Sequence, residues 1–347
     1  MIRNGLVESV HEGDVAVVDP AGRVVASAGD PERLLFGRSC EKPVQGAVSI
    51  DAIDEPGLTD DEVAVLCGSH DGDDVHLRAV RKLLRRGPVP ASALRNPRDR
   101  RSGGSRSRLH DNCSGKHAAM LVASARNGWD LATYRERRHP IQRRVARAVA
   151  VATGVDDPIV GVDGCGLPVH GVPLRAMATM YARLARPEAF GRLAPAVERV
   201  IAGMLASPLL VGGRKRLDSD VIAATGDVVA KEGAEGLVCA ALLGPGLGVA
   251  VKVTDGSWRR SGPAFVKVLD DLGVLDRDAR GRLAGHARLP VLGGDEPQGA
   301  VEAVVRLRRA RGRRIAPRPD RGRRREAADG SGRGGNGSSR SRVAHCR

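Results

Sequence analysis

The chain has 347 residues, of which 41% are apolar and 2% aromatic, with a formal net charge of +15. This length suits one large domain or two modest ones, and the apolar share can build a core from Val, Ala and Leu. The positive charge is concentrated in two segments. Residues 306–347 hold 15 arginines against three acidic residues, and residues 95–108 hold six arginines against Asp99. The rest is close to neutral, so the charge of the main body argues neither for nor against a polyanionic partner.

Six cysteines are scattered along the chain without the spacing of a disulfide framework: Cys40, Cys67, Cys113, Cys165, Cys239 and Cys346. The first residues lack the apolar core of a secretory signal. No segment approaches the roughly 20 apolar residues of a membrane span. We therefore expect a reduced, soluble, cytoplasmic protein without a membrane partner.

Residues 15–18 and 22–26 are rich in β-formers and flank Asp-Pro-Ala, which predicts a hairpin. A helix is expected from Pro43, because proline is tolerated in a first turn. The short apolar run 63–67 is interpreted as a buried strand, and 75–86 as an amphipathic helix ended by Gly-Pro. Residues 95–108 have no periodicity and are expected to form a surface loop.

Further helices are expected over 117–126, 140–152, 174–184, 193–205 and, as the last one, 264–272. Strands are expected over 159–162, 227–230, 237–243 and 247–253. This pattern predicts an α/β (α+β) layered fold, with a mixed sheet packed against helices. The segment after residue 305 has almost no apolar residues and cannot offset the entropy of ordering. We therefore predict a catalytic domain over 1–305 and a disordered Arg/Gly/Ser-rich tail over 306–347.

The first candidate for chemistry is Ser39, three residues before Lys42 at a helix start, a spacing that places both side chains on one helix face. A lysine whose pKa is lowered by burial can take the proton of a serine hydroxyl. The plain alternative is a helix cap beside a solvated lysine, because S-x-x-K alone is a weak signal.

Four other polar clusters follow apolar segments: Cys67-Gly68-Ser69-His70, Asn112 to His117, Asp163 to Pro168, and Lys231-Glu232-Gly233. Thiolates of Cys113 and Cys165 can bind zinc, although two cysteines without a C-x-x-C pair are a poor metal signature and the spacing favours two buried structural thiols. Lys231 before x-Gly allows close approach of a substrate backbone, or is an exposed lysine at a strand end. S-x-x-K, a later serine and K-x-G occur in the order used by serine enzymes of the β-lactamase-like fold.

Together these blocks resemble the asparaginase II family of the Rhizobium etli type, from about residue 3 to about residue 306. The resemblance rests on Arg38-Ser39 through Lys42-Pro43, Cys67 to His70, Asn112 to His117, Asp163 to Pro168, Lys231 to Gly236, and Glu8 to His11 near the start. It implies a fold like that of serine β-lactamases and glutaminases. It further implies an amidohydrolase that converts L-asparagine to aspartate and ammonia, and a homodimer.

The resemblance also implies roles for individual residues. Ser39 would be the nucleophile and Lys42 its base, with Ser69 and Lys231 as a second Ser-Lys pair that relays protons. Arg38, Asp163 and His117 would support the substrate and the ligands around it. Zinc would be the cofactor, and its expected ligands are Cys113, Lys116 and Cys165.

Three alternatives stay open at this level. Glutaminase activity is a near neighbour, since one methylene is worth only about 1–3 kcal/mol of discrimination. A β-lactamase-like hydrolase shares the motif order, but Ser69 does not begin an S-x-N triplet. Nucleic-acid binding through the arginine-rich tail belongs to another class; against it, the tail has no aromatic residues for stacking. Residues 95–108 are shorter and more basic than the family pattern leads us to expect.

Overall fold

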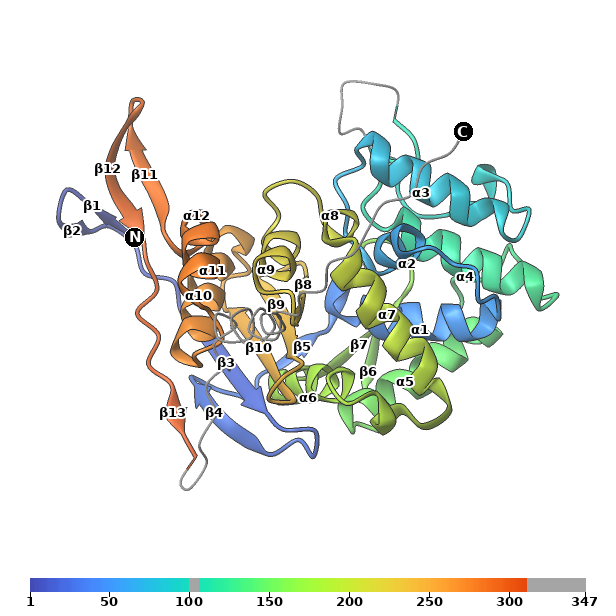
Figure 1. Cartoon of the computed structure of the whole chain (residues 1–347), viewed down its shortest axis with the longest axis horizontal. Coiled ribbons are helices and arrows are strands. Elements are labelled where there is room, and N and C mark those ends of the chain that lie inside the picture. Colours follow the sequence, from blue (N-terminus) through green and yellow to red (C-terminus); the bar gives the residue numbers. More distant parts are fainter. Residues whose placement is uncertain (100–105, 311–347) are drawn as a thin grey trace, which may run out of the picture.

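The computed structural model describes residues 1–99 and 106–310. A six-stranded antiparallel sheet forms its centre, in the order β13-β4-β3-β10-β9-β8 (Figure 1). The strands are β3 (Gly13–Val18), β4 (Val24–Ala28), β8 (Val228–Glu232), β9 (Leu237–Leu242), β10 (Leu247–Val253) and β13 (Arg308–Arg309). The layered α/β class is confirmed, while the sheet is antiparallel where a mixed one was expected. The predicted first hairpin is confirmed as β3–β4, and its turn is closed by Asp19, whose Oδ1 accepts the N–H groups of Ala21 and Arg23.

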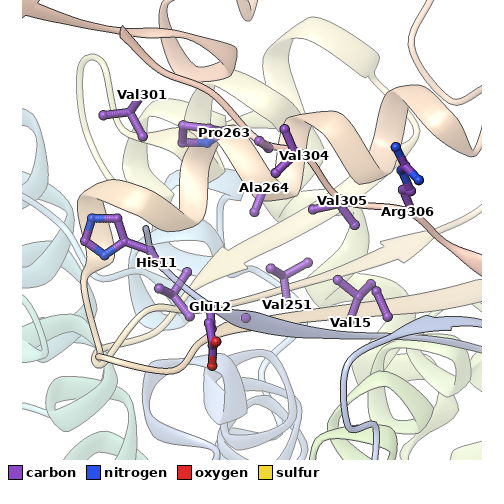
Figure 2. Close-up of a pocket in the computed structure, with 14 residues that line it drawn as sticks. His11, Glu12, Val15, Val251, Pro263, Ala264, Val301, Val304, Val305 and Arg306 are labelled. Carbon is purple, nitrogen blue, oxygen red and sulfur yellow. The ribbon is translucent and has the colours of Figure 1, made fainter. Parts of the chain in front are cut away.

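Two helices cover the two faces of this sheet. Gly248 of β10 lies against α6 (Leu174–Leu184) so closely that a Cβ there would overlap the carbonyl oxygen of Ala178. Side chains alternate along a strand, so Val251 and Val253 point to the other face. There they line an apolar groove of about 260 Å³ with Pro263 and other residues of α10 (Trp258–Asp271) (Figure 2).

Most of the other helices lie toward the right side of Figure 1, and the last of them in sequence packs against β8 nearer its middle. They are α1 (Lys42–Ile53), α2 (Asp60–Cys67), α3 (Asp74–Arg85), α4 (Ser114–Arg126), α5 (Pro140–Thr153), α7 (Ala194–Ala206), α8 (Pro208–Val211) and α9 (Leu217–Thr225). Helix α4 lies in the middle, in contact with α1, α2 and α3, and is buried from Ser114 to Ser124. A small antiparallel sheet of β5 (Leu34–Phe36), β7 (Pro168–Pro173) and β6 (Ile159–Val162) borders α5 and α6.

The expected strand over 63–67 is wrong, because these residues form the second half of α2. A capping box starts this helix: the Thr59 side chain accepts from the third helical N–H, and Glu62 accepts from the Thr59 N–H at 2.8 Å. Residues 63–67 are fully buried, and a buried strand and a buried helix are equally apolar, so the apolar run could not distinguish between them.

The C-terminal part contains more structure than the sequence indicated. The helix expected to be last, over 264–272, corresponds to α10, and α11 (Arg277–Arg282) and α12 (Ala284–Ala287) follow it. Strands β11 (Leu289–Gly293) and β12 (Glu296–Val301) then pair with β1 (Ile2–Arg3) and β2 (Leu6–Val7). The segment expected to be a tail begins at Arg306, and its Arg308–Arg309 pair with β4 as β13. Residues 311–347 lie outside the described residues, as do 100–105 of the expected loop.

Within the ranges that the structure describes, none of the helices has the length and apolar character needed to cross a bilayer.

Candidate active site

The turn that carries Ser39 joins β5 to α1. It forms the 3-10 helix η1 (Arg38–Glu41), and α1 follows at once with Lys42-Pro43 in its first turn. Arg38 has a φ of 48°, a left-handed conformation that a residue with a side chain adopts only when its surroundings enforce it. Within residues 1–99 and 106–310, no hydrogen bond engages the half-buried Ser39 hydroxyl. The hydroxyl is therefore free to meet a substrate.

Lys42 is fully buried below this turn. Its Nζ donates to the Gly68 carbonyl at 2.5 Å, to the Ser69 hydroxyl at 2.9 Å and to the Asn112 carbonyl at 3.3 Å. Burial lowers the pKa of Lys42, and the positive charge of Lys116 lowers it further against an opposing effect of Cys113. A buried amine with a lowered pKa is suited to accept a proton.

Lys231 is the second buried lysine, near the end of β8. Its Nζ forms an ion pair with Asp218 of α9 and donates to the Glu232 carbonyl at 2.9 Å. Burial alone would raise the pKa of Asp218, but the charge of Lys231 lowers it to about 2. The hydrogen bond that the structure shows for the Ser69 hydroxyl comes from Lys42, so the expected direct pairing of Ser69 with Lys231 is not what this geometry shows.

Arg216, which the sequence analysis missed, ties these elements together. Its Nη1 donates to Asp71 at 2.8 Å and to the Ser69 carbonyl at 3.4 Å, and its Nε donates to Glu232 at 3.2 Å. Burial raises the pKa of Glu232, and the negative charge of Asp218 raises it further. Arg216 thus fixes the Ser69 backbone relative to β8. No local motif marks it, because its partners come from distant segments.

The three residues expected to bind zinc lie together. Cys113 caps α4, Lys116 lies one turn later, and Cys165 follows β6; all three are buried. The Cys113 thiol donates to Asn112 Oδ1 at 3.2 Å. The neighbouring Cys165 lowers the pKa of Cys113 well below its ordinary value, and Cys113 in turn raises the pKa of Cys165. Lys116 Nζ lies 3.4 Å from Cys165 Sγ.

Two thiols and an amine are donor types that zinc binds, and one separation within the set can be compared with zinc geometry. Nitrogen and sulfur ligands at typical Zn–N and Zn–S distances lie about 3.6 Å apart, close to the observed Lys116–Cys165 separation. Burial would lower the pKa of Lys116, but the charges of Cys165 and Cys113 raise it, so this lysine must lose a proton to bind a metal. Across residues 1–99 and 106–310, no group of three His, Cys, Asp or Glu side chains is arranged to hold an ion. The expected zinc ligands differ from such a group, because the third of them is a lysine.

Asp163 links the Ser39 turn to the thiols. Its Oδ1 accepts from Arg38 Nε at 2.7 Å, and its Oδ2 accepts from the Cys165 thiol at 3.3 Å. Burial would raise the pKa of Asp163, but the positive charges of Lys116 and Arg38 lower it to about 2. The carboxylate therefore stays ionised and holds both segments in place.

His117 is fully buried beside this cluster, and burial lowers its pKa well below the ordinary value. The Tyr134 hydroxyl accepts the Arg95 N–H at 3.0 Å and contacts His117 Nδ1 at 2.6 Å. This arrangement favours a proton on Nε2, which has no partner among the described residues. A buried ring nitrogen without a partner is available to a ligand.

Glu41 anchors the Ser39 turn from the other side, and the sequence analysis gave it no role. Its carboxylate accepts the backbone N–H of His170 at 2.8 Å and contacts His170 Nδ1 at 2.9 Å, with both side chains buried. The Gly37 N–H also donates to the His170 carbonyl at 2.9 Å. The turn is thus held to β7 by three contacts.

Solved structures with similar folds include Mglu, at 17% identity and a TM-score of 0.46, covering 77% of this chain and 68% of that one. Mglu in its glutamate form has 17% identity and a TM-score of 0.45, covering 77% and 62%. A β-lactamase from Mycobacterium bovis has 15% identity and a TM-score of 0.38, covering 70% and 87%. No curated protein matches the sequence.

The family model described as L-asparaginase II matches residues 1–303, which include every predicted site residue. The structure brings these residues into one network in which Lys42 contacts Ser69, and Arg38, Asp163 and Cys165 form a chain of contacts. This chain is a member of the L-asparaginase II family and, by that membership, an amidohydrolase.

Proposed function

We propose that this protein hydrolyses the side-chain amide of L-asparagine through an acyl-enzyme on Ser39. The observation that carries the proposal is the environment of Lys42, which is fully buried, has a lowered pKa and lies 2.9 Å from the Ser69 hydroxyl. Ser39 precedes it by three residues, a spacing that places two side chains on one face of a helix. One neutral amine would then serve two hydroxyl groups.

In the first half-reaction, Ser39 Oγ attacks the amide carbon while Lys42 Nζ takes the hydroxyl proton. The carbon–nitrogen bond of the resulting intermediate breaks, and the proton passes from Lys42 through Ser69 to the departing nitrogen, which leaves as ammonia. In the second half-reaction, water attacks the ester and gives its proton to Lys42, and Ser39 Oγ leaves with a proton. The product is aspartate. The Asp218–Lys231 pair and Arg216 support the Ser69 side of this relay.

We propose that Cys113, Lys116 and Cys165 hold a zinc ion, with His117 and Asp163 beside it. When bound, zinc would supply positive charge that orients the substrate. The chain's own residues carry the proton transfers. The reduced thiols that this set requires also support a cytoplasmic location.

The test is ammonia release from L-asparagine and L-glutamine by wild type and Ser39→Ala. The matched control is Ser92→Ala, which removes an exposed hydroxyl far along the chain from the predicted motifs. We expect release from asparagine by wild type and Ser92→Ala, and its loss in Ser39→Ala. Faster release from glutamine would favour the glutaminase alternative. A folded wild type that releases ammonia from neither substrate would overturn the proposal, and a chromogenic lactam would then be the next substrate.

A further inference from the structure

A second cavity, of about 220 Å³, lies against the N-terminal half of α5 and the strands β6 and β7. Arg137, Arg143 and Arg147 line it, and the buried His170 lies at its base. It contains none of the residues proposed for catalysis or zinc binding. A water molecule takes about 30 Å³ of liquid volume, so a five-atom oxyanion fits together with several waters.

Among the described residues, the arginines around this cavity have no acidic partner. In the described part of the chain, no carboxylate forms an ion pair with Arg137, Arg143 or Arg147, whereas the neighbouring Arg144 pairs with Asp51 at 3.6 Å. Arg143 and Arg147 lie four residues apart on one helix face, where like charges destabilise the helix. The first turn of α5 also has no acidic residue, although a helix N-terminus favours negative charge. A bound anion would relieve this repulsion.

His170 adds a polar group to the base of the cavity. Its Nδ1 contacts Glu41 at 2.9 Å, and its other ring nitrogen has no hydrogen bond within residues 1–99 and 106–310. Since the residue is only 2% exposed, that nitrogen can be solvated only through the cavity. A ligand there would meet a buried ring nitrogen as well as surface guanidinium groups.

We propose that this cavity binds a free tetrahedral oxyanion of the phosphate class. A guanidinium group can donate two parallel hydrogen bonds to two oxygens of one phosphate. Three guanidinium groups match the charge of a dianion better than the charge of a single carboxylate. The cavity is small, and its lining has no Phe, Tyr or Trp side chain on which a nucleic-acid base would stack. The site would adjoin the Ser39 turn through the Glu41–His170 contact, and it does not depend on the proposed amidase activity.

The test is isothermal titration calorimetry with inorganic phosphate at constant ionic strength, on the full chain. Arg143→Ala/Arg147→Ala removes two guanidinium groups of the cavity. Arg78→Ala/Arg81→Ala is the matched control, because it removes two exposed arginines from α3 with the same change in charge. Circular dichroism checks that each protein is folded. Arginines elsewhere contribute equally to both double variants.

We expect wild type and the α3 variant to bind phosphate with the same affinity, and the α5 variant to bind more than about tenfold more weakly. Equal weakening in both variants would overturn the proposal, because binding would then follow overall charge. Absence of phosphate binding by the wild type would do so too. Acetate binding as tightly as phosphate would overturn the assignment of the ligand class.

Discussion

Lys42 Nζ lies 2.9 Å from Ser69 Oγ, with both side chains buried where the start of α1 meets the turn after α2. The contact joins two motifs that are 27 residues apart in the sequence. It makes Lys42 the partner of Ser69 in this structure, and we propose that Lys42 also serves Ser39, which precedes it by three residues. Lys231 is instead engaged with Asp218. The proposed proton path therefore centres on Lys42.

Lys42→Arg tests this path. Arginine keeps the positive charge but does not lose its proton at accessible pH, so the base is removed while much of the electrostatic environment stays. We expect kcat for asparagine to fall by about 10²–10⁴. Lys82→Arg, which alters a lysine with a 45%-exposed side chain, is the matched control and should keep full activity. A Lys42→Arg enzyme that retains the wild-type rate would show that another group accepts the Ser39 proton.

The pH dependence of the rate follows from the same lysine. Burial lowers the pKa of Lys42 below the ordinary 10.5 because it penalises the ammonium form. The neutral, active form grows as the pH rises, so kcat should increase with pH through a midpoint below 10.5. The measurement is ammonia release across the alkaline range, with Lys42→Arg as the reference. Persistence of the same rising limb in Lys42→Arg would assign it to a different group.

Asp218 and Lys231 provide a stability test. Asp218→Asn leaves Lys231 buried without a counter-charge, which should lower the free energy of unfolding by about 3–5 kcal/mol. Asp218→Asn/Lys231→Met removes both charges and should recover part of that loss. Urea unfolding measures each effect. The control Asp270→Asn breaks a surface pair with Arg280, whose side chain is 55% exposed, and should cost no more than about 1 kcal/mol.

The same pair predicts how the free energy of unfolding changes at acid pH. The pKa of Asp218 is lowered from 3.8 to about 2 in the folded chain, so the unfolded chain binds the proton more readily. The stabilisation is complete above pH 3.8 and is lost as the pH falls toward about 2. Asp218→Asn should flatten this part of the curve. An unchanged curve, or equal stability of the single and double variants, would contradict a buried charge pair.

The sequence predicted much of the secondary structure, because most elements have a clear periodicity. The helix expected over 174–184 is α6 with the same limits, and the strand expected over 247–253 is β10. The strand predicted for residues 63–67 was wrong because a short, fully apolar segment suits a buried strand and a buried helix alike. The capping residues Thr59 and Glu62 were the available signal, since a Thr-x-x-Glu pattern marks a helix start.

The candidate site was likewise only partly predictable from the sequence. Ser39 with Lys42 and Cys113 with Lys116 are close in sequence on helical segments, so their proximity follows from local geometry. The contacts of Lys42 with Ser69 and of Lys231 with Asp218 could not be predicted in this way, because only the tertiary fold brings each pair together. Arg216 and His170 belong to no motif, and their roles depend on buried contacts between distant elements.

The proposed zinc ligands predict the metal content of the protein. Wild type purified with zinc should hold about one zinc ion per chain, and Cys113→Ala and Cys165→Ala should lose it, because each removes a thiolate ligand. Cys67→Ala is the matched control, since Cys67 is equally buried but outside the set. Elemental analysis measures the metal, and a chelator should lower the melting temperature of wild type and Cys67→Ala but not that of Cys113→Ala or Cys165→Ala. Retention of zinc by Cys113→Ala would place the ion elsewhere.

The glycine between Cys113 and Lys116 predicts a packing effect on the whole site. A Cβ at Gly115 would overlap the carbonyl group of Val65, because α4 crosses α2 with the two backbones in contact. Gly115→Ala must push the helices apart, and we expect it to lower the free energy of unfolding by about 1–3 kcal/mol.

The displacement begins between two proposed zinc ligands, so zinc content and asparagine hydrolysis should fall together with stability. Gly281→Ala is the matched control: it makes the same change in helix α11, where no atom lies within 4 Å of an added Cβ. That substitution should stabilise the protein by up to about 1 kcal/mol, because alanine favours a helix over glycine. Urea unfolding of both variants separates the two effects. Equal stabilisation by Gly115→Ala would mean that α2 and α4 are not packed through their backbones.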